Sequence, residues 1–527
     1  MTSRRRLLTI GLATVLLAAA CDSAVPSSTA TSSSPAAASQ SLAAFTPTFA
    51  EATCPTDVTT NVVIRATCGF LTVLEDRAQP TGRTIQLFVV RFDPPGGTTT
   101  PDPIITLGHL ASQDGYGEMS GGGQRTHRIQ YLMDPRGIGH STPSLDCPEI
   151  ALVGPDLAGL RLRDPARTAT LAKAVAACHD RLVAQGIQLA SYDLAANAAD
   201  LDDLRITLGI KTWNLMSNGD ASRIAFEVAR RFPAGLRSLI VDSPSLPTPD
   251  FLTVGPASLD LAIAQVVAIC AKQPACSRSF PDASAMIRRA IARLDAEPVE
   301  FDIAGTVDAI RLGHPVHAVI DGAALARIIR FGLGGGGGND AGRALETVRD
   351  TLDGKLRADD PNVLAIASDV GDCVGILTSC ELPNFGAVLS IMCRDFATQV
   401  DQGRLTESLD GRPAYADLFS PSPLVTACPA WSVSPATALV PSSPTGGVPT
   451  LVLHGALDPF SASVADVTSA TQGSPNVYVL PIPNQSYNAL GFTECPRAIR
   501  NAWIDAITSP PADASCLARI PEPILVP

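Results

Sequence analysis

The residues best placed for nucleophilic chemistry lie in one short turn, residues 217–220 (Ser-Asn-Gly-Asp), between an apolar run and an amphipathic segment. Residues 212–216 are mostly apolar with several β-formers, which is typical of a buried strand. Residues 222–232 place most of their apolar side chains on one helical face, and Pro233 ends that segment. A strand that bends sharply into a helix can present a serine hydroxyl or an aspartate carboxylate for attack on an electrophile.

The stretch 211–233 resembles the nucleophile elbow of the secreted tripeptidyl aminopeptidase-like hydrolases, which are α/β-hydrolases related to proline iminopeptidases. That family follows the pattern W/Y-N-L-x-G-x-S-Y-G-x-R-x-A, with a helix ending in R-x-P. The residues of this chain that fit it are Trp213, Asn214, Leu215, Arg223, Ala225 and Pro233. The same register places Gly219 at the position of the nucleophilic serine. The resemblance therefore implies an α/β-hydrolase fold, a mostly parallel sheet flanked by helices, with a degenerate nucleophile position.

The other two catalytic positions follow from the same resemblance. Residues 449–459 (PTLVLHGALDP) match the family pattern P-T-L-x-x-x-G-x-x-D-P, which assigns Asp458 as the triad acid. Counting back from Gly491 and Cys495 places Tyr487 where the family has its histidine. None of the seven histidines follows Asp458, so the order nucleophile, acid, histidine is not completed.

The oxyanion region departs from the family as well. After the strand expected at 103–108, the family carries a G-G-P-G-x-S-G loop whose glycines let backbone N–H groups approach the oxyanion. This chain has Gly108 and His109 there, and residues 109–114 replace the flexible middle of the loop. We assign Gly108, His109 and Asp220 to the expected oxyanion region.

These departures predict a hydrolase scaffold that has lost the triad mechanism, because glycine cannot attack and tyrosine is a poor base at neutral pH. Such a pseudo-hydrolase would bind a peptide or a small apolar ligand. The alternative is an active serine-type peptidase or esterase with a non-standard nucleophile, either Ser217 or Asp220, using His109 as base. A third possibility is a purely structural envelope protein with an occluded pocket.

Residues 134–141 (DPRGIGHS) are similar to a second family motif, D-x-R-G-x-G-x-S. Its glycines predict a tight turn, and we expect Asp134 and Arg136 to pair near the site in a structural role.

The chain of 527 residues divides into five predicted parts. Residues 1–21 form an export signal with three arginines and an apolar run, and Cys21 is its predicted lipidation site. A Ser/Thr/Ala/Pro-rich tether is expected over 22–50. The resemblance then implies a hydrolase core at 51–245, a mainly helical cap at 246–430, and the second part of the core at 431–527.

The thirteen cysteines leave an even twelve after Cys21, which indicates disulfides in an exported chain. Proximity suggests the pairs Cys54–Cys68, Cys270–Cys276 and Cys495–Cys516. The spacings do not form a zinc site, and no cofactor is indicated. The net charge of −12 argues against nucleic acid and against a basic membrane-binding face, so we expect membrane contact only through the lipid anchor.

Periodicity also predicts elements that flank these motifs. Strands are expected at 84–92, 103–108, 127–134, 236–242, 451–453 and 477–480. Asp164 and Pro165 predict the start of a helix that ends before Gly186, and a second helix is expected over 193–208.

Overall fold

The computed structural model describes most of the chain from residue 45 onward. The described residues are 45–60, 65–94, 96–97, 100–107, 126–246, 251–304, 307–334, 338–361, 363–364, 384–397, 400–412, 415–419, 423–436, 444–507, 511 and 513–525. The predicted signal, Cys21, most of the tether, Gly108 and His109 lie outside these residues.

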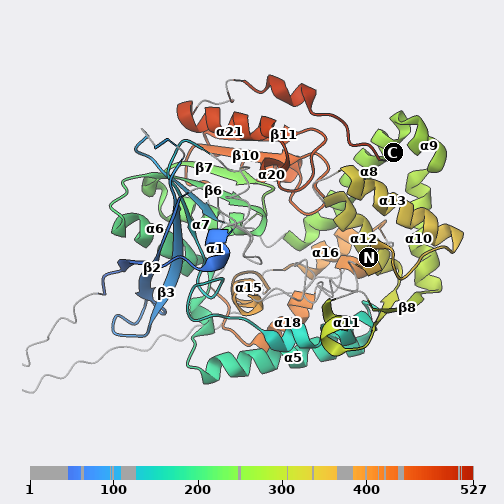
Figure 1. The fold of residues 1–527 in the computed structure, drawn as a ribbon, viewed down its shortest axis with the longest axis horizontal. Helices are drawn as coiled ribbons and strands as arrows, with labels where there is room; N and C mark the ends of the chain where they lie inside the picture. Colours follow the sequence, from blue (N-terminus) through green and yellow to red (C-terminus); the bar gives the residue numbers. More distant parts are fainter. Residues whose placement is uncertain are drawn as a thin grey trace, which may run out of the picture. The chain divides into compact units, whose positions relative to one another are not determined.

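A nine-stranded sheet runs through the molecule in the order β1-β2-β3-β5-β4-β6-β7-β10-β11 (Figure 1). Its strands are β1 (Thr48–Ala52), β2 (Ala66–Leu74), β3 (Thr84–Phe92), β4 (Ile104–Leu107), β5 (Gln130–Met133), β6 (Trp213–Asn218), β7 (Leu236–Asp242), β10 (Thr450–Gly455) and β11 (Val477–Ile482). The six strands from β5 to β11 pair in parallel, whereas β1, β2 and β3 pair antiparallel. The sheet is therefore mostly parallel, as predicted.

The predicted strands are confirmed within a few residues, because parallel strands covered on both faces are continuous apolar runs that are easily recognised. The sequence analysis missed β1 and β2. β1 begins at Thr48, so the sheet starts inside the range that was predicted to be tether. Exposed and half-buried positions predominate in β1, which leaves it without a strong apolar pattern.

Helices cover both faces of the sheet. A large cluster of buried side chains, the core cluster, lies on one face and contains Leu215 and Trp213 of β6. A smaller cluster on the other face contains Met216 of β6 and Ile240 of β7. The helices outside the cap are α1 (Thr56–Thr60), α3 (Pro148–Leu152), α4 (Gly154–Ala158), α5 (Pro165–Ala184), α6 (Leu194–Thr207), α7 (Ser222–Arg231), α15 (Phe385–Ile391), α18 (Pro423–Trp431), α19 (Val464–Ala470), α20 (Ala489–Phe492) and α21 (Glu494–Ala506).

The two predicted helix starts are confirmed by their caps. The Asp164 carboxylate accepts a hydrogen bond from the Ala166 N–H at the start of α5. Asp193 accepts one from the Ala196 N–H at the start of α6. These side chains satisfy N–H groups that the first helical turn leaves without partners.

The cap has its own interior, a second cluster of buried aliphatic and aromatic side chains that we call the cap cluster. It is mainly helical, as predicted, but it also contains an antiparallel pair, β8 and β9, that the sequence analysis missed. Its elements are α8 (Phe251–Lys272), α9 (Pro274–Ser279), α10 (Ala283–Ala296), β8 (Val299–Ile303), α11 (Val307–Leu312), β9 (Val316–Ile320), α12 (Gly322–Gly334), α13 (Gly338–Asp353), α16 (Gln402–Leu409) and α17 (Ala416–Phe419). Among the described residues, Thr253–Lys272 is long and apolar enough to cross a membrane, but half of it is buried inside the protein.

The end of the predicted cap range packs with the core instead. Residues 385–396 and Trp431 contribute buried side chains to the core cluster. The disulfide Cys393–Cys428 joins these two segments, with Cα atoms 5.2 Å apart. The cap cluster therefore draws little on residues after Phe419, and the boundary at 430 lies too late for this packing.

A short C-terminal tail connects the two interiors (Figure 1). Ile520 belongs to the cluster on the second face of the sheet, and Leu525 belongs to the cap cluster. Between them, Gln273, which lies between α8 and α9, donates a hydrogen bond to the Pro523 carbonyl at 2.7 Å and accepts one from the Leu525 N–H at 3.1 Å.

Arg136 forms a buried network, but not with the partner expected. Its guanidinium donates to both carboxylate oxygens of Asp200 at 2.7 Å, and to the carbonyls of Glu75 at 2.8 Å and Ser191 at 2.6 Å. The predicted pairing with Asp134 is wrong. A planar guanidinium makes two parallel bonds to a facing carboxylate, and Asp200 on α6 is the carboxylate that faces it.

The Asp134 carboxylate instead organises the turn that follows it. It accepts a hydrogen bond from the His140 N–H at 2.8 Å. Gly139 has φ +60°, and a Cβ there would lie 2.2 Å from an Asp134 carboxylate oxygen. The Ser141 hydroxyl donates to the Asp134 carbonyl and accepts from the Phe88 N–H. We call Arg136, Asp200, Asp134, Gly139 and Ser141 the Arg136 cluster.

All three predicted disulfides are present: Cys54–Cys68, Cys270–Cys276 and Cys495–Cys516. The structure adds Cys147–Cys178 and Cys393–Cys428. The remaining predicted cysteines, Cys373 and Cys380, lie outside the described residues.

Candidate functional site

The strand–turn–helix bend is present and places Gly219 at its apex. Gly219 follows β6 directly, has φ +56°, and begins the short helical turn Gly219–Ala221 that leads into α7. The Ser222 hydroxyl lies 2.5 Å from the Gly219 carbonyl and 2.8 Å from the Ser245 carbonyl. The bend is therefore tied to the segment after β7, and its apex carries no side chain.

Ser217 does not occupy the apex. It lies within β6, opposite Leu107 of β4 and Val241 of β7, and is 1% exposed. Because side chains alternate along a strand, Ser217 shares a face with Leu215, whereas Asn218 projects to the other face. The Ser217 hydroxyl has no hydrogen-bond partner among the described residues.

The acid position lies after β10, as the sequence predicts for the end of a parallel strand. Asp458 is 4% exposed, and its Oδ1 accepts hydrogen bonds from the Phe460 N–H at 2.8 Å and the Ser461 N–H at 3.2 Å. Its Oδ2 has no partner within the described part of the chain. The carboxylate is thus held by its own turn, with one oxygen still available.

Residues 485–490, which follow β11 and run into the start of α20, bring the strand ends together, and we call them the 485–490 loop. The Leu457 N–H beside the acid turn donates to the Gln485 carbonyl at 2.9 Å. On the other side, the Asn218 side-chain amide donates to the Asn488 side chain at 3.3 Å. Tyr487 lies in this loop, and its ring is 5.6 Å from the Phe460 ring in an edge-on arrangement.

Asp242, which the sequence analysis did not single out, clamps this loop to the end of β7. Its carboxylate accepts hydrogen bonds from the backbone N–H groups of Ala489 at 3.2 Å and Leu490 at 2.7 Å. The neighbouring Ser243 hydroxyl accepts from the Asn488 N–H at 2.9 Å. The sequence feature that could have identified Asp242 is its position as the last residue of an apolar strand. We call residues 217–220, Asp242, Asp458 and the 485–490 loop the elbow edge.

Burial sets the electrostatics of this edge. It raises the pKa of Asp242 to about 7, and the Asp458 charge adds to the increase while the two backbone N–H donors oppose it. Burial also lowers the pKa of Arg223, in the first turn of α7, to about 10, against the opposing effects of Asp220 and Tyr487. A buried cation and two buried carboxylates therefore surround the bend.

None of the described histidines forms a hydrogen bond with the Ser217 hydroxyl. His127, His140, His179 and His317 lie within 3.2 Å of the carboxylates of Asp505, Asp57, Asp180 and Asp302, respectively. His314 contacts a backbone carbonyl and is exposed. His454 is buried within β10, and neither of its ring nitrogens has a partner among the residues that the structure describes.

One group of potential metal ligands lies close together in the described part of the chain. Cys147, Glu149 and Cys178 lie close enough together to share an ion, but the two cysteines are joined in a disulfide and lack free thiolates. These three residues therefore do not provide the free ligands that a metal ion would need.

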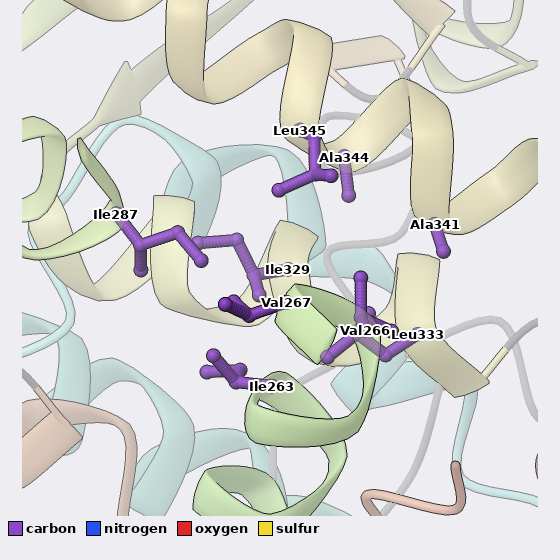
Figure 2. A pocket seen from close by; sticks show the side chains of 9 residues that line it. All are labelled: Ile263, Val266, Val267, Ile287, Ile329, Leu333, Ala341, Ala344 and Leu345. Atoms are coloured by element: carbon purple, nitrogen blue, oxygen red, sulfur yellow. The ribbon is translucent and has the colours of Figure 1, made fainter. Parts of the chain in front are cut away.

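A small cavity lies inside the cap and not at the elbow edge. Figure 2 shows it surrounded by aliphatic side chains from α8, α10, α12 and α13. Its volume is about 10 Å³, which is the space of a single water molecule. The lining residues are Ile263, Val266, Val267, Ile287, Ile329, Leu333, Ala341, Ala344 and Leu345.

No protein-family model and no curated protein sequence matches the chain. Among solved structures, a proline iminopeptidase from Mycobacterium smegmatis is 14% identical, with a TM-score of 0.35 over 80% of this chain and 95% of that one. An α/β-hydrolase fold protein from Chitinophaga pinensis is 10% identical, with a TM-score of 0.34 over 80% and 94%. An α/β fold family hydrolase from Bacillus anthracis str. Sterne is 12% identical, with a TM-score of 0.31 over 77% and 90%. The sheet topology and the bend at Gly219 identify this chain's fold as an α/β-hydrolase fold.

Proposed function

We propose that this chain is an exported α/β-hydrolase-fold protein that has lost the serine–histidine mechanism and binds a peptide or a small apolar ligand. The observation that carries this proposal is Gly219, which lies at the apex of the bend with φ +56° and has no hydroxyl. Tyr487 stands in the loop where the resemblance expects the histidine. The five disulfides of the described residues are compatible with export.

The chemistry of acyl transfer supports the loss of activity. A serine hydrolase needs a base that takes the hydroxyl proton and returns it to the leaving group. Ser217 is buried on the opposite face of β6 from Asn218, the residue that contacts the 485–490 loop. Even with Ser217 as nucleophile, none of the described histidines forms a hydrogen bond with its hydroxyl.

Two assays test the proposal directly. We expect no labelling of the purified protein by a fluorophosphonate probe and no turnover of aminoacyl or peptidyl p-nitroanilides. Labelling that disappears in Ser217→Ala, or turnover that disappears in Asp220→Asn, would support the non-standard nucleophile instead.

A double reversion measures how much of the mechanism was lost. Gly219→Ser combined with Tyr487→His restores a hydroxyl at the apex and an imidazole in the loop. Gly219→Ser alone is the matched control, because it adds the hydroxyl without a base. Activity in the double variant and not in the control would indicate that only the reactive groups are missing.

The ligand part of the proposal rests on the polar atoms left at the elbow edge. Asp458 Oδ2 and Asn218 Oδ1 are buried and have no partners among the described residues, so a bound ligand could satisfy them. Native mass spectrometry of protein purified from the exporting cells should reveal a co-purified mass that is released on denaturation. Protein that carries no such mass, and that binds none after incubation with a peptide library, would favour the structural envelope role.

A further inference from the structure

The end of cap helix α12 lies directly on the acid turn. The Arg330 Nε donates a hydrogen bond to the Pro459 carbonyl at 3.3 Å. The Arg330 guanidinium also lies 4.9 Å from the Phe460 ring centre and 5.0 Å from the Phe419 ring centre. A guanidinium between two aromatic rings is attracted to both faces, so Arg330 fixes α12 to the turn next to Asp458.

Phe460 links this helix to Tyr487. The Phe331 ring of α12 lies 5.2 Å from the Phe460 ring on one side, and the Tyr487 ring lies 5.6 Å away on another. Gly334 approaches Phe460 so closely that a Cβ on Gly334 would lie 1.8 Å from the ring. The aromatic contacts therefore run continuously from α12 through the acid turn to the 485–490 loop.

A hydrogen bond closes the same junction at the backbone. The Ser486 hydroxyl donates to the Leu333 carbonyl at 2.5 Å, next to the last residue of α12. Gly219 and Asp458 are both buried. The 485–490 loop that holds Ser486 also contacts Leu457, next to Asp458, and Asn218, next to Gly219. Cap and core are thus joined through the loop that contacts the neighbours of both residues.

We propose that α12 is a closed lid over the elbow edge and that Tyr487 serves as part of its seat. The lid seat consists of Phe419, Phe460 and Tyr487, with Arg330 and Phe331 as the residues of α12 that contact it. A ring at position 487 extends the aromatic surface that holds α12 down. The inference does not depend on the proposed loss of catalysis, because a closed lid would restrict access to a working centre equally.

A thiol placed at the apex tests the lid. Gly219→Cys introduces a thiol under the junction, and the rate of its modification by N-ethylmaleimide reports how often the site opens. The parent chain without this substitution gives the background labelling. We expect slow labelling of Gly219→Cys in the native protein, approaching the unfolded rate only in denaturant.

Lid variants in the Gly219→Cys background should then change that rate. Arg330→Ala should accelerate labelling at least tenfold, whereas Arg343→Ala should leave it unchanged, because Arg343 on α13 pairs with Asp340 at the surface. Tyr487→Phe keeps the ring and should remain slow, whereas Tyr487→Ala should be fast. This second pair tests the seat even if Arg330→Ala fails to fold.

Two results would overturn the inference. One is rapid labelling of Gly219→Cys in the otherwise unchanged protein, which would mean that the site is open. The other is equal labelling rates in Tyr487→Ala and Tyr487→Phe, with both variants folded by circular dichroism, which would remove Tyr487 from the seat. Neither result depends on whether any variant hydrolyses a substrate.

Discussion

The Arg136 cluster and the elbow edge belong to the same sheet but treat their buried polar groups in opposite ways. In the Arg136 cluster, the guanidinium makes two bonds to Asp200 and further bonds to backbone carbonyls, and the Ser141 hydroxyl both donates and accepts. At the elbow edge, Ser217 Oγ, Asn218 Oδ1 and Asp458 Oδ2 have no partners among the described residues.

The difference separates a network that holds the frame from an edge where some buried polar atoms have no protein partner among the described residues. Buried polar groups cost free energy unless they are hydrogen-bonded, so a structural network becomes fully paired. Buried groups without a protein partner are candidates for hydrogen bonds to water or to a ligand. The fully paired Arg136 cluster therefore supports the frame, and the proposed loss of reactive groups concerns only Gly219 and Tyr487 at the elbow edge.

Arg136→Ala should produce the largest loss of stability. The substitution removes both guanidinium bonds from Arg136 to the fully buried Asp200 carboxylate, which keeps only Arg77 as a charged partner among the described residues, and breaking a buried ion pair costs about 3 kcal/mol. Urea unfolding of the purified protein measures this change. Arg357→Ala, which breaks an exposed pair with Asp359, is the control and should cost less than about 1 kcal/mol. Equal losses of unfolding free energy in the two variants would contradict a structural role for the buried Arg136–Asp200 pair.

Asp242→Asn should remove a pH dependence that belongs to the elbow edge. The folded-state pKa of Asp242, about 7, lies above its usual value, so between about pH 4 and pH 7 the folded state holds a proton that the unfolded state has lost. The stability from this group is complete at low pH and declines as pH rises towards 7, by up to about 1.4 kcal/mol per pH unit.

Urea unfolding at pH 5, 6 and 7 tests this expectation. Relative to Asp242→Asn, the parent should lose about 2 kcal/mol of unfolding free energy over that range. Asp359→Asn, at an exposed position, should follow the parent at each pH. Parallel curves for the parent and Asp242→Asn would show that Asp242 stays ionised in the folded state.

Gly139→Ala should reveal how tightly the Arg136 cluster is packed. The substitution places a Cβ against the Asp134 carboxylate and forces a left-handed backbone on alanine, so we expect a loss of about 2–3 kcal/mol. Gly473→Ala is matched, because Gly473 has φ +81° with no atoms within 4 Å of its Cβ position, and it should lose only about 1 kcal/mol. Thermal unfolding of both variants separates the cost of packing from that of backbone strain. Similar losses of stability in the two variants would mean that the Asp134 carboxylate moves aside to accommodate the added Cβ.

The smallest expected changes in stability come from two serine substitutions, one in the Arg136 cluster and one at the elbow edge, and they compare these two regions directly. Ser141→Ala removes a hydroxyl with two partners and should cost about 1 kcal/mol, whereas Ser217→Ala removes a hydroxyl with none and should be neutral or slightly stabilising. Chemical unfolding of the two variants provides the comparison. A clear loss in Ser217→Ala would reveal a partner for this hydroxyl.

The parts of this molecule that were predictable from sequence are those where local chemistry and burial agree. The apolar runs of β3, β7 and β10 and the capping aspartates Asp164 and Asp193 indicate their elements directly, because each signal lies within a few residues. Cysteine pairs that are close in the sequence were found, whereas Cys147–Cys178 and Cys393–Cys428, 31 and 35 residues apart, were not.

The candidate site was predictable in position but not in its contacts. The motifs placed Gly219, Asp458 and Tyr487, but their neighbours come from distant segments. The sequence does not show that Arg136 faces Asp200, 64 residues away, or that Asp242 clamps the 485–490 loop. Phe460 and α12 meet for the same reason, because cap and core contacts depend on how two separate interiors are assembled.

The tail from Ile520 to Leu525 offers a way to measure how the cap and the sheet are held together. Since one end is anchored beneath the sheet and the other inside the cap, cleavage within these residues would leave both interiors intact while removing one mechanical connection between them. A spectroscopic label at position 522, where the Glu522 side chain is 36% exposed, would therefore report displacement of the cap relative to the sheet. It would not disturb the buried side chains of the cap cluster or of the cluster on the second face of the sheet.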